Sequence, residues 1–200
     1  MIIVKSNSFN IIKNLIDYSF SLFCLIILIP VILILTIAIF ATVKGSVIFT
    51  QNRIGKEGIP FNLYKFRSLQ NGTENGVPLV NGKNDERITS LGRLMRKHKL
   101  DEIPNFVNVL KGDMSIVGPR PEQQFYIEQI LSKNPDYKLL QSIKPGITSW
   151  GQVKYGYAEN VDQMLERFEF DLYYLRHRSL WFDLKIAVGT IGIIIRGEGI

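Results

Sequence analysis

The chain has 200 residues, a formal net charge of +6 and 46% hydrophobic residues. A single stretch, residues 18–43, is long and apolar enough to cross a bilayer, which excludes a protein with several membrane spans. The remainder has the composition of an ordinary water-soluble domain, which excludes disorder for most of the chain. Cys24 is the one cysteine, so no intramolecular disulfide can form. The positive charge indicates an anionic partner: nucleic acid, lipid headgroups or a phosphorylated small molecule.

The apolar run at residues 18–43 predicts a membrane helix with a break. As a straight helix it would reach ~39 Å at ~1.5 Å per residue, against a hydrocarbon core of ~30 Å. Pro30 removes a backbone hydrogen bond near its middle and favours a kink. Both flanks carry net positive charge, whereas a spanning helix is expected to have it on one side. A single spanning helix and a re-entrant helix that turns back at Pro30 both stay open on these observations.

The next segment predicts a small β-hairpin. Residues 46–51 are rich in strand formers, 55–58 supply a turn, and 61–67 form the second strand. Lys65 and Arg67 fall on the same face of that strand, a pattern typical of a half-buried strand with a solvated basic face. The Asn-Gly-rich segment 70–86 predicts a long loop.

Helical periodicity returns at Thr89 and predicts a basic amphipathic helix, which beside a membrane anchor could lie on anionic lipid. A second helix is expected around Pro104, a residue tolerated in a first helical turn. Asp101 and Glu102 then fall at the start of this helix, and Gly112 ends it.

The rest of the chain predicts a rigid link followed by mainly helical structure. Expected elements are an extended link at 118–121, a helix at 122–132, a turn at 144–148 leading into 150–153, and helices at 161–176 and 180–195. The last helix is apolar with an aromatic start, which is typical of helices that lie in a membrane interface. The predicted fold class is α+β and predominantly helical, with an N-terminal membrane segment, residues 1–44, and a catalytic domain, residues 45–200.

Asp101 and Glu102 are the strongest candidates for chemistry. Acidic residues at a helix start can simply cap the helix. An adjacent carboxylate pair among cations can also provide a nucleophile for phosphoryl transfer and oxygen ligands for a divalent cation. Arg120 lies between two prolines, which restrict its backbone. Its guanidinium could bind a phosphate group through two hydrogen bonds, or it could have a structural role and bind nearby carbonyl groups. The two histidines lack zinc-site spacing, and the chain has no Walker or G-x-G-x-x-G loop.

The string LDEIPNFVNVLKGDMSIVGPRPE at residues 100–122 closely resembles the core motif of the bacterial sugar transferase family, the monotopic phosphoglycosyl transferases. Weaker matches follow in family order along nearly the whole chain: Lys13 with Asp17, the apolar run, 49–51, 64–66, 144–148, 152–153 and 183–185. The resemblance implies a small, minimal catalytic form without an additional amino-terminal membrane domain.

The resemblance implies transfer of a sugar-1-phosphate from a UDP-sugar to polyprenyl (undecaprenyl) phosphate, giving a polyprenyl-diphosphate-sugar and UMP. This would be the first membrane step of a bacterial glycoconjugate pathway. The enzyme would lie at the cytoplasmic face of the bacterial inner membrane with both termini cytoplasmic. Expected partners besides the two substrates are membrane lipids and downstream glycosyltransferases, and no nucleic acid.

The resemblance also assigns roles to individual residues. Asp101 would form a covalent phosphosugar intermediate with ping-pong kinetics, and Glu102 would help to hold Mg²⁺. Further family positions bind the phosphorylated substrate: Lys65, Arg96, Arg120 and Asp183. The family's re-entrant helix breaks at a Ser-Pro pair, and here the pair is Ile29-Pro30, so the proline is kept and the serine hydroxyl is lost.

Two other functions are consistent with parts of the sequence. A membrane-anchored nucleic-acid-binding protein could use the basic helix and the aromatic–basic stretch at 64–67. An inactive scaffold of the same family could dock glycosyltransferases, although the intact carboxylate pair argues against it. The sugar, the glycoconjugate and the oligomeric state are not specified by any single residue, and sugar specificity is expected to reside in 70–86 and 144–160.

Overall fold

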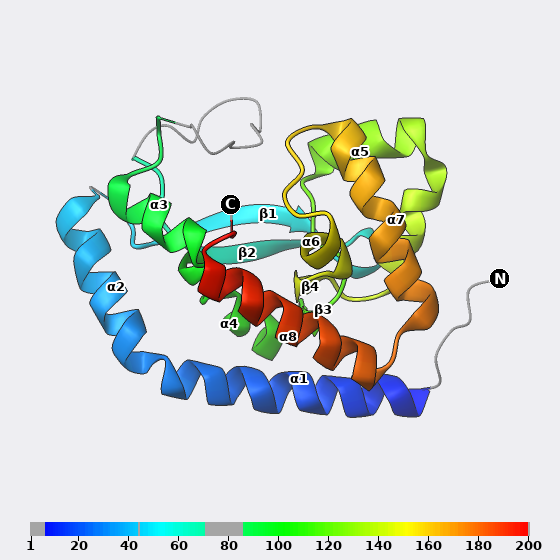
Figure 1. Ribbon diagram of the computed structural model, residues 1–200, viewed down its shortest axis with the longest axis horizontal. Coiled ribbons are helices and arrows are strands. Elements are labelled where there is room, and N and C mark those ends of the chain that lie inside the picture. Colours follow the sequence, from blue (N-terminus) through cyan, green and yellow to red (C-terminus); the bar gives the residue numbers. More distant parts are fainter. Residues whose placement is uncertain (1–6, 44, 71–85, 200) are drawn as a thin grey trace.

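The computed structural model describes residues 7–43, 45–70 and 86–199. These residues form a mostly helical protein with two small β-sheets (Figure 1). The α-helices are α1 (Asn7–Ile27), α2 (Ile29–Thr42), α3 (Ser90–Lys97), α4 (Asn105–Lys111), α5 (Gln124–Lys133), α6 (Trp150–Lys154), α7 (Val161–His177) and α8 (Leu180–Arg196). The strands are β1 (Ile48–Ile54), β2 (Pro60–Phe66), β3 (Ser115–Val117) and β4 (Gly146–Thr148), and the 3₁₀ turns are η1 (Lys56–Gly58), η2 (Leu100–Glu102) and η3 (Pro135–Ser142).

The N-terminal arm, defined as α1 and α2, bends sharply between its two helices (Figure 1). α1 ends at Ile27, and α2 begins at Ile29, with Pro30 in its first turn. Pro30 has no N–H to donate to the carbonyl of Ile26, so the helical ladder is interrupted there. The two helices therefore meet at a bend beside Pro30, where the sequence predicts a kink.

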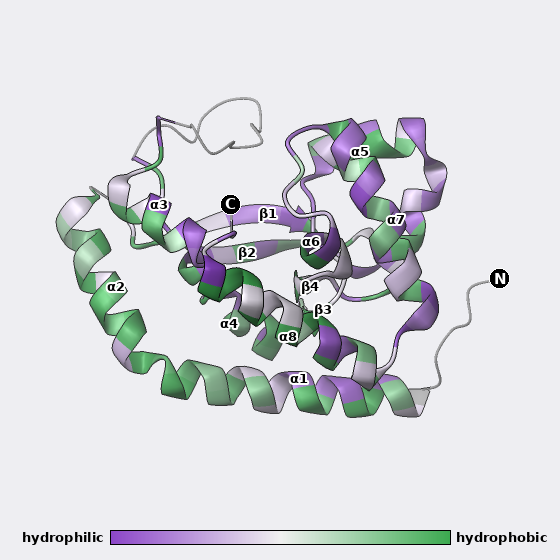
Figure 2. Ribbon diagram, in the orientation of Figure 1, coloured by the Kyte–Doolittle hydropathy of each residue, from purple (hydrophilic) through white to green (hydrophobic). Residues whose placement is uncertain are grey.

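The outward surface of the arm is apolar (Figure 2). Large apolar side chains along both helices are more than half exposed, among them Leu15, Phe23, Ile34, Ile37 and Phe40. α1 is long and apolar enough to cross a membrane, and within the described residues it is the one helix that meets both conditions. An exposed apolar surface of this extent indicates contact with lipid or with another protein.

The inward side of the arm belongs to the core of the domain. Leu35 and Ile39 of α2 are buried in a cluster with Phe66 of β2, Met95 of α3 and Ile103. α1 is attached through polar contacts as well, since Lys13 pairs with Asp183 of α8 at 2.7 Å. The predicted parts 1–44 and 45–200 therefore share one packed interior.

The hairpin is formed by β1 and β2 in antiparallel register, with Phe49 opposite Lys65. Its turn contains η1, as the turn-rich residues 55–58 predict. Phe66 is buried against α2 and α3, and the side chain of Lys65 is 17% exposed. The interpretation of this strand as having a solvated basic face is wrong, because that face is turned toward η2.

A second sheet, which the sequence did not predict, consists of β3 and β4 in parallel, with Ser115 opposite Gly146. The segment interpreted as a turn at 144–148 thus supplies a strand. Gly146 and Gly118 make this pairing possible, because a Cβ at either position would collide with the backbone of the other segment. This close approach fixes where the link after β3 begins.

The later helices follow the predicted order, with boundaries shifted by at most two residues. Asp101 and Glu102 lie in η2, ahead of α4, and not in the first turn of that helix. Gly112 ends α4 in a left-handed conformation, as expected. Of the loop predicted at 70–86, residues 71–85 lie outside the described part of the chain.

Candidate active site

The carboxylate pair, Asp101 and Glu102, occupies the short turn η2 between α3 and α4. Lys99, just ahead of this turn, has a φ of 52°, in the left-handed region that non-glycine residues seldom adopt. This conformation ends α3 and redirects the chain into η2. Both carboxylates are buried, with side chains 9% exposed. Buried carboxylates need charged or hydrogen-bonding partners, and the neighbouring elements provide cations.

Lys65 brings the hairpin to the carboxylate pair. Its Nζ lies 2.7 Å from Oε1 of Glu102 and 3.9 Å from Oδ2 of Asp101. Asn108 fixes the position of this strand relative to α4, because its amide accepts from Tyr64 N–H at 3.1 Å and donates to Asn62 O at 2.7 Å. Strand β2 and α4 are thereby joined beside Lys65.

Two further cations face Glu102. Lys99 Nζ lies 3.5 Å from Oε2 of Glu102, and Arg120 Nη1 lies 3.5 Å from Oε1. Arg96, in the last turn of α3, donates from Nε to Ser68 Oγ at 2.9 Å. Its positive charge acts to lower the pKa of Asp101. The structure therefore brings together five predicted site residues: Asp101, Glu102, Lys65, Arg96 and Arg120.

The two carboxylates are held in different electrostatic states. Burial raises the pKa of Asp101 above its ordinary value, with Lys65 opposing this and the adjacent Glu102 adding to it. Burial also acts to raise the pKa of Glu102, but Lys65, Lys99 and Arg120 outweigh it and hold that pKa well below its usual range. Glu102 is thus a firmly ionised carboxylate, and Asp101 is the more basic of the two.

Asp183 does not contact this cluster. Its Oδ2 lies 2.7 Å from Lys13 Nζ, and its Oδ1 accepts from the hydroxyl of Tyr174 at 2.6 Å. The same lysine lies 3.6 Å from Asp17, whose carboxylate accepts from Ser115 at 2.6 Å. This buried network fastens α1 to α7, α8 and β3. The expected role of Asp183 in substrate binding has no counterpart in these contacts.

The donor atoms around η2 suit a hard divalent cation. Asp101 and Glu102 provide adjacent carboxylates, and Oδ1 of the buried Asn105, one helical turn further on, has no hydrogen-bond partner among the described residues. The described residues contain no cluster of three or more acidic, histidine or cysteine ligands. A cation here would therefore complete its coordination with substrate phosphate oxygens and water, as Mg²⁺ commonly does.

Several residues of the site were not identified from the sequence. The pattern places Lys99 only in a basic helix, although its spacing of three residues before Glu102 is a usable signal for a contact within a turn. Asn105 and Asn108 lie in the same string as the carboxylate pair, and nothing in residue type alone distinguishes them from surface amides. Their burial becomes evident only when β2 lies against α4.

The site is thus a buried carboxylate pair surrounded by four cationic side chains, on a domain that carries a bent apolar arm. The chain belongs to the bacterial sugar transferase family, whose sequence pattern matches residues 8–197. The resemblance seen in residues 100–122 is thereby confirmed.

Curated relatives carry more specific names. The chain is 42% identical over 171 residues to a UDP-N-acetylgalactosamine-undecaprenyl-phosphate N-acetylgalactosaminephosphotransferase of Aeromonas hydrophila, covering 85% of the chain and 40% of the relative. It is 38% identical over 183 residues to a UDP-glucose:undecaprenyl-phosphate glucose-1-phosphate transferase of Escherichia coli (strain K12), covering 90% and 39%. It is 38% identical over 191 residues to the uncharacterized sugar transferase EpsL of Bacillus subtilis (strain 168), covering 95% and 90%. The chain thus spans about two fifths of the length of the first two relatives.

Proposed function

We propose that this protein is a phosphoglycosyl transferase that moves a sugar-1-phosphate from a UDP-sugar to polyprenyl phosphate. The observation that carries the proposal is the unequal pairing of the two buried carboxylates. Glu102 engages three cations, whereas Asp101 has the raised pKa and hence the more nucleophilic oxygen. The names of the relatives support the substrate classes, a UDP-sugar and undecaprenyl phosphate.

In the proposed first step, an Asp101 carboxylate oxygen attacks the β-phosphorus of the UDP-sugar. The bond from that phosphorus to the oxygen bridging the two phosphates breaks, and UMP leaves with the electron pair. Lys65, Arg96 and Arg120 bind the phosphate oxygens on which negative charge develops. In the second step, a polyprenyl phosphate oxygen attacks the phosphorus, the bond from phosphorus to Asp101 breaks, and the free carboxylate is restored.

Mg²⁺ is part of the proposal, with Glu102 as its protein ligand beside Asp101. When bound, the ion would neutralise charge on the diphosphate. Addition of a chelator is expected to abolish transfer, with recovery on adding Mg²⁺ back.

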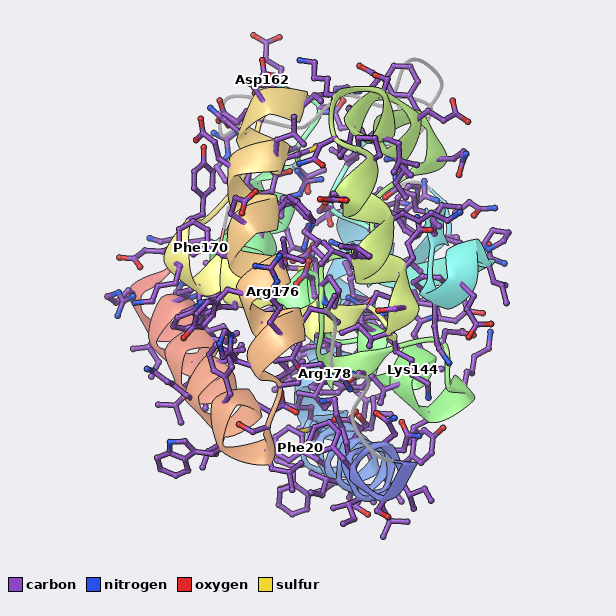
Figure 3. All side chains as sticks on the ribbon, turned by 90° about the vertical axis from the view of Figure 1, so that its right-hand side faces the viewer. Phe20, Lys144, Asp162, Phe170, Arg176 and Arg178 are labelled. Atoms are coloured by element: carbon purple, nitrogen blue, oxygen red, sulfur yellow. The ribbon has the colours of Figure 1, made fainter. Side chains whose placement is uncertain are left out.

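The arm is proposed to be a re-entrant anchor at the cytoplasmic face of the inner membrane. Its bend at Pro30 and its apolar outer surface support this placement (Figure 2). α8 is proposed to lie in the same interface, because Trp181, Val188 and Ile195 form an exposed apolar stripe along it. Figure 3 shows Phe20 of α1 at one end of the molecule and Asp162 of α7 at the other, so α1 lies away from Asp162.

The proposed function is tested by incubating the purified protein with a panel of UDP-sugars. Without lipid acceptor, we expect a burst of UMP of at most one equivalent and a mass increase equal to one sugar phosphate on the intact protein. With polyprenyl phosphate, turnover should continue. Asp101→Asn should abolish the burst and the adduct, whereas Asp162→Asn, an exposed aspartate on α7, should retain both. Unchanged activity of Asp101→Asn would disprove the nucleophile assignment.

A further inference from the structure

Glu122 occupies an unusual position directly after the link at 118–121 that carries Arg120. Its side chain is 5% exposed and lies between two arginines from distant elements. Oε2 lies 3.1 Å from Arg53 Nη1 on β1, and Oε1 lies 2.5 Å from Arg167 Nη2 on α7. Each carboxylate oxygen therefore has its own guanidinium, and neither contact includes the substrate site itself.

The backbone of the link is held by the same groups. Arg53 Nη1 also donates to the carbonyl of Pro121 at 3.0 Å. The N–H of Ile54 donates to the carbonyl of Glu122 at 3.0 Å. Asp171, one helical turn after Arg167 on α7, accepts from the backbone N–H of Gly151 at 2.8 Å and lies near the backbone N–H of Arg120. β1 thus holds the link at Pro121 and Glu122, and α7 holds it through the side chain of Glu122.

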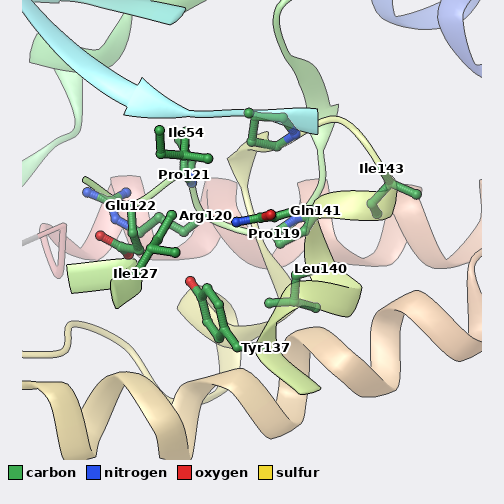
Figure 4. A pocket seen from close by; sticks show the side chains of 12 residues that line it. Ile54, Pro119, Arg120, Pro121, Glu122, Ile127, Tyr137, Leu140, Gln141 and Ile143 are labelled. Atoms are coloured by element: carbon green, nitrogen blue, oxygen red, sulfur yellow. The ribbon is translucent and has the colours of Figure 1, made fainter. Parts of the chain in front are cut away.

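The link is packed against β4 at Gly118 and borders a small hollow further along. This hollow opens to solvent and has Tyr137 and Leu140 on the side opposite the link (Figure 4). Where the link borders this hollow, its hydrogen bonds and ion pairs help to fix its position.

Electrostatic repulsion between neighbouring arginines is a second reason why the link needs the negative charge of Glu122. The side chain of Arg53 is 11% exposed, and burial lowers its pKa, with Glu122 opposing this effect and the neighbouring Arg120 adding to it. Arg53 and Arg120 repel each other, which would disfavour the observed position of the link if Glu122 carried no charge. Glu122 counters that repulsion while Arg120 extends toward Glu102.

We propose that Glu122, held between Arg53 and Arg167, is a positioning residue that sets the guanidinium of Arg120 for binding the phosphates of the UDP-sugar. This inference rests on the proposed function and adds to it a residue that acts only through Arg120. Its consequence is that substrate binding depends on an ion-pair cluster behind the site.

The test is a double-mutant cycle between Glu122 and Arg120. Glu122→Gln keeps the shape and removes the charge, and it should raise KM for the UDP-sugar by about tenfold, in the range of couplings between neighbouring charged residues. In an Arg120→Ala background, single-turnover UMP release should be unaffected by Glu122→Gln. An equal loss in both backgrounds, or an unchanged KM in the single variant, would overturn the proposal.

Further variants separate positioning from folding. Glu128→Gln makes the same chemical change at an exposed site on α5 and should leave KM unchanged. Glu122→Asp keeps the charge but is too short to reach both arginines, so it should give an intermediate KM, and it replaces Glu122→Gln in the cycle if that variant fails to fold. Absence of wild-type turnover would count against the proposed function, whereas wild-type turnover with an unaltered Glu122→Gln counts against this inference alone.

Discussion

Lys65 donates to Glu102 at 2.7 Å, whereas the other carboxylate of the pair lies 3.9 Å from the same ammonium. The ammonium of Lys65, on strand β2, is therefore closer to Glu102 than to Asp101. This asymmetry helps to give Glu102 the depressed pKa and leaves Asp101 with the raised one.

Lys65→Met should shift the pH dependence of transfer. Asp101 must be ionised to attack, so activity is lost as the pH falls through its pKa, which burial raises and Lys65 lowers. Removing Lys65 raises that pKa further, and the acid limb of the rate profile should move to higher pH. We also expect a loss of about 10²-fold at the optimum, because a group that stabilises developing charge is removed.

The control for this variant is Lys111→Met. Lys111 also contacts β2, through the hydroxyl of Tyr64 at 2.9 Å, but its side chain is 48% exposed and does not contact Asp101 or Glu102. Its profile should match the wild type. An acid limb that stays in place in Lys65→Met would contradict the assigned interaction with Asp101.

Ile39→Ala should destabilise the domain through the arm. Ile39 is fully buried in the cluster that contains Ile103, the residue directly after Glu102. Truncation of a buried isoleucine costs about 3 kcal/mol, which should be measurable as a lower midpoint of denaturant unfolding in detergent. Ile37→Ala removes an equal volume from a side chain that is 69% exposed and should leave the midpoint unchanged. Equal losses in the two variants would show that α2 does not pack as described.

Asp183→Asn distinguishes an anchoring role from the substrate-binding role expected from the sequence. Its contacts with Lys13 and Tyr174 predict a stability loss of about 3 kcal/mol, because a buried lysine loses its closest counter-ion. KM for the UDP-sugar should not change at temperatures where the variant is folded. A raised KM with unaltered unfolding would return Asp183 to the substrate site.

The local parts of the fold were predictable, and the long-range contacts were not. The hairpin and the break at Pro30 follow from turn residues, strand formers and a missing N–H, all of which act within a few positions. The pairing of β3 with β4 joins three-residue strands that have too few positions to show a period. Glu122 and Arg167 are 45 positions apart, and their pairing arises only when α7 packs against the link.

The site itself divides in the same way. The string at 100–122 contains Asp101, Glu102 and Arg120, and its resemblance to a family was enough to assemble most of the cluster. Residue types alone could not distinguish a helix-capping role of the carboxylate pair from a catalytic role, since either role is consistent with acidic residues at the start of a helix. That decision needed Lys65 from β2 and the left-handed turn at Lys99.

The two helices of the arm are attached to the same body, which predicts how the arm lies in the membrane. Lys13, in the first half of α1, contacts Asp183 of the domain, and Ile39, near the end of α2, packs beside Ile103 of the same domain. A helix that crossed the bilayer once could not keep both attachments. We expect Ser8→Cys and Asp162→Cys, each in a Cys24→Ser background, to react with an impermeant maleimide from the same face of sealed vesicles.

Detergent permeabilisation provides the control for that experiment, because both cysteines should then react fully whichever face they occupy. Ser8 and Asp162 are exposed, so slow labelling in sealed vesicles would reflect the membrane barrier and not burial in the protein. Labelling of the two positions from opposite faces would mean that α1 spans the bilayer. The buried pair of Lys13 with Asp183 could then not form, and Asp183→Asn would have no effect on stability.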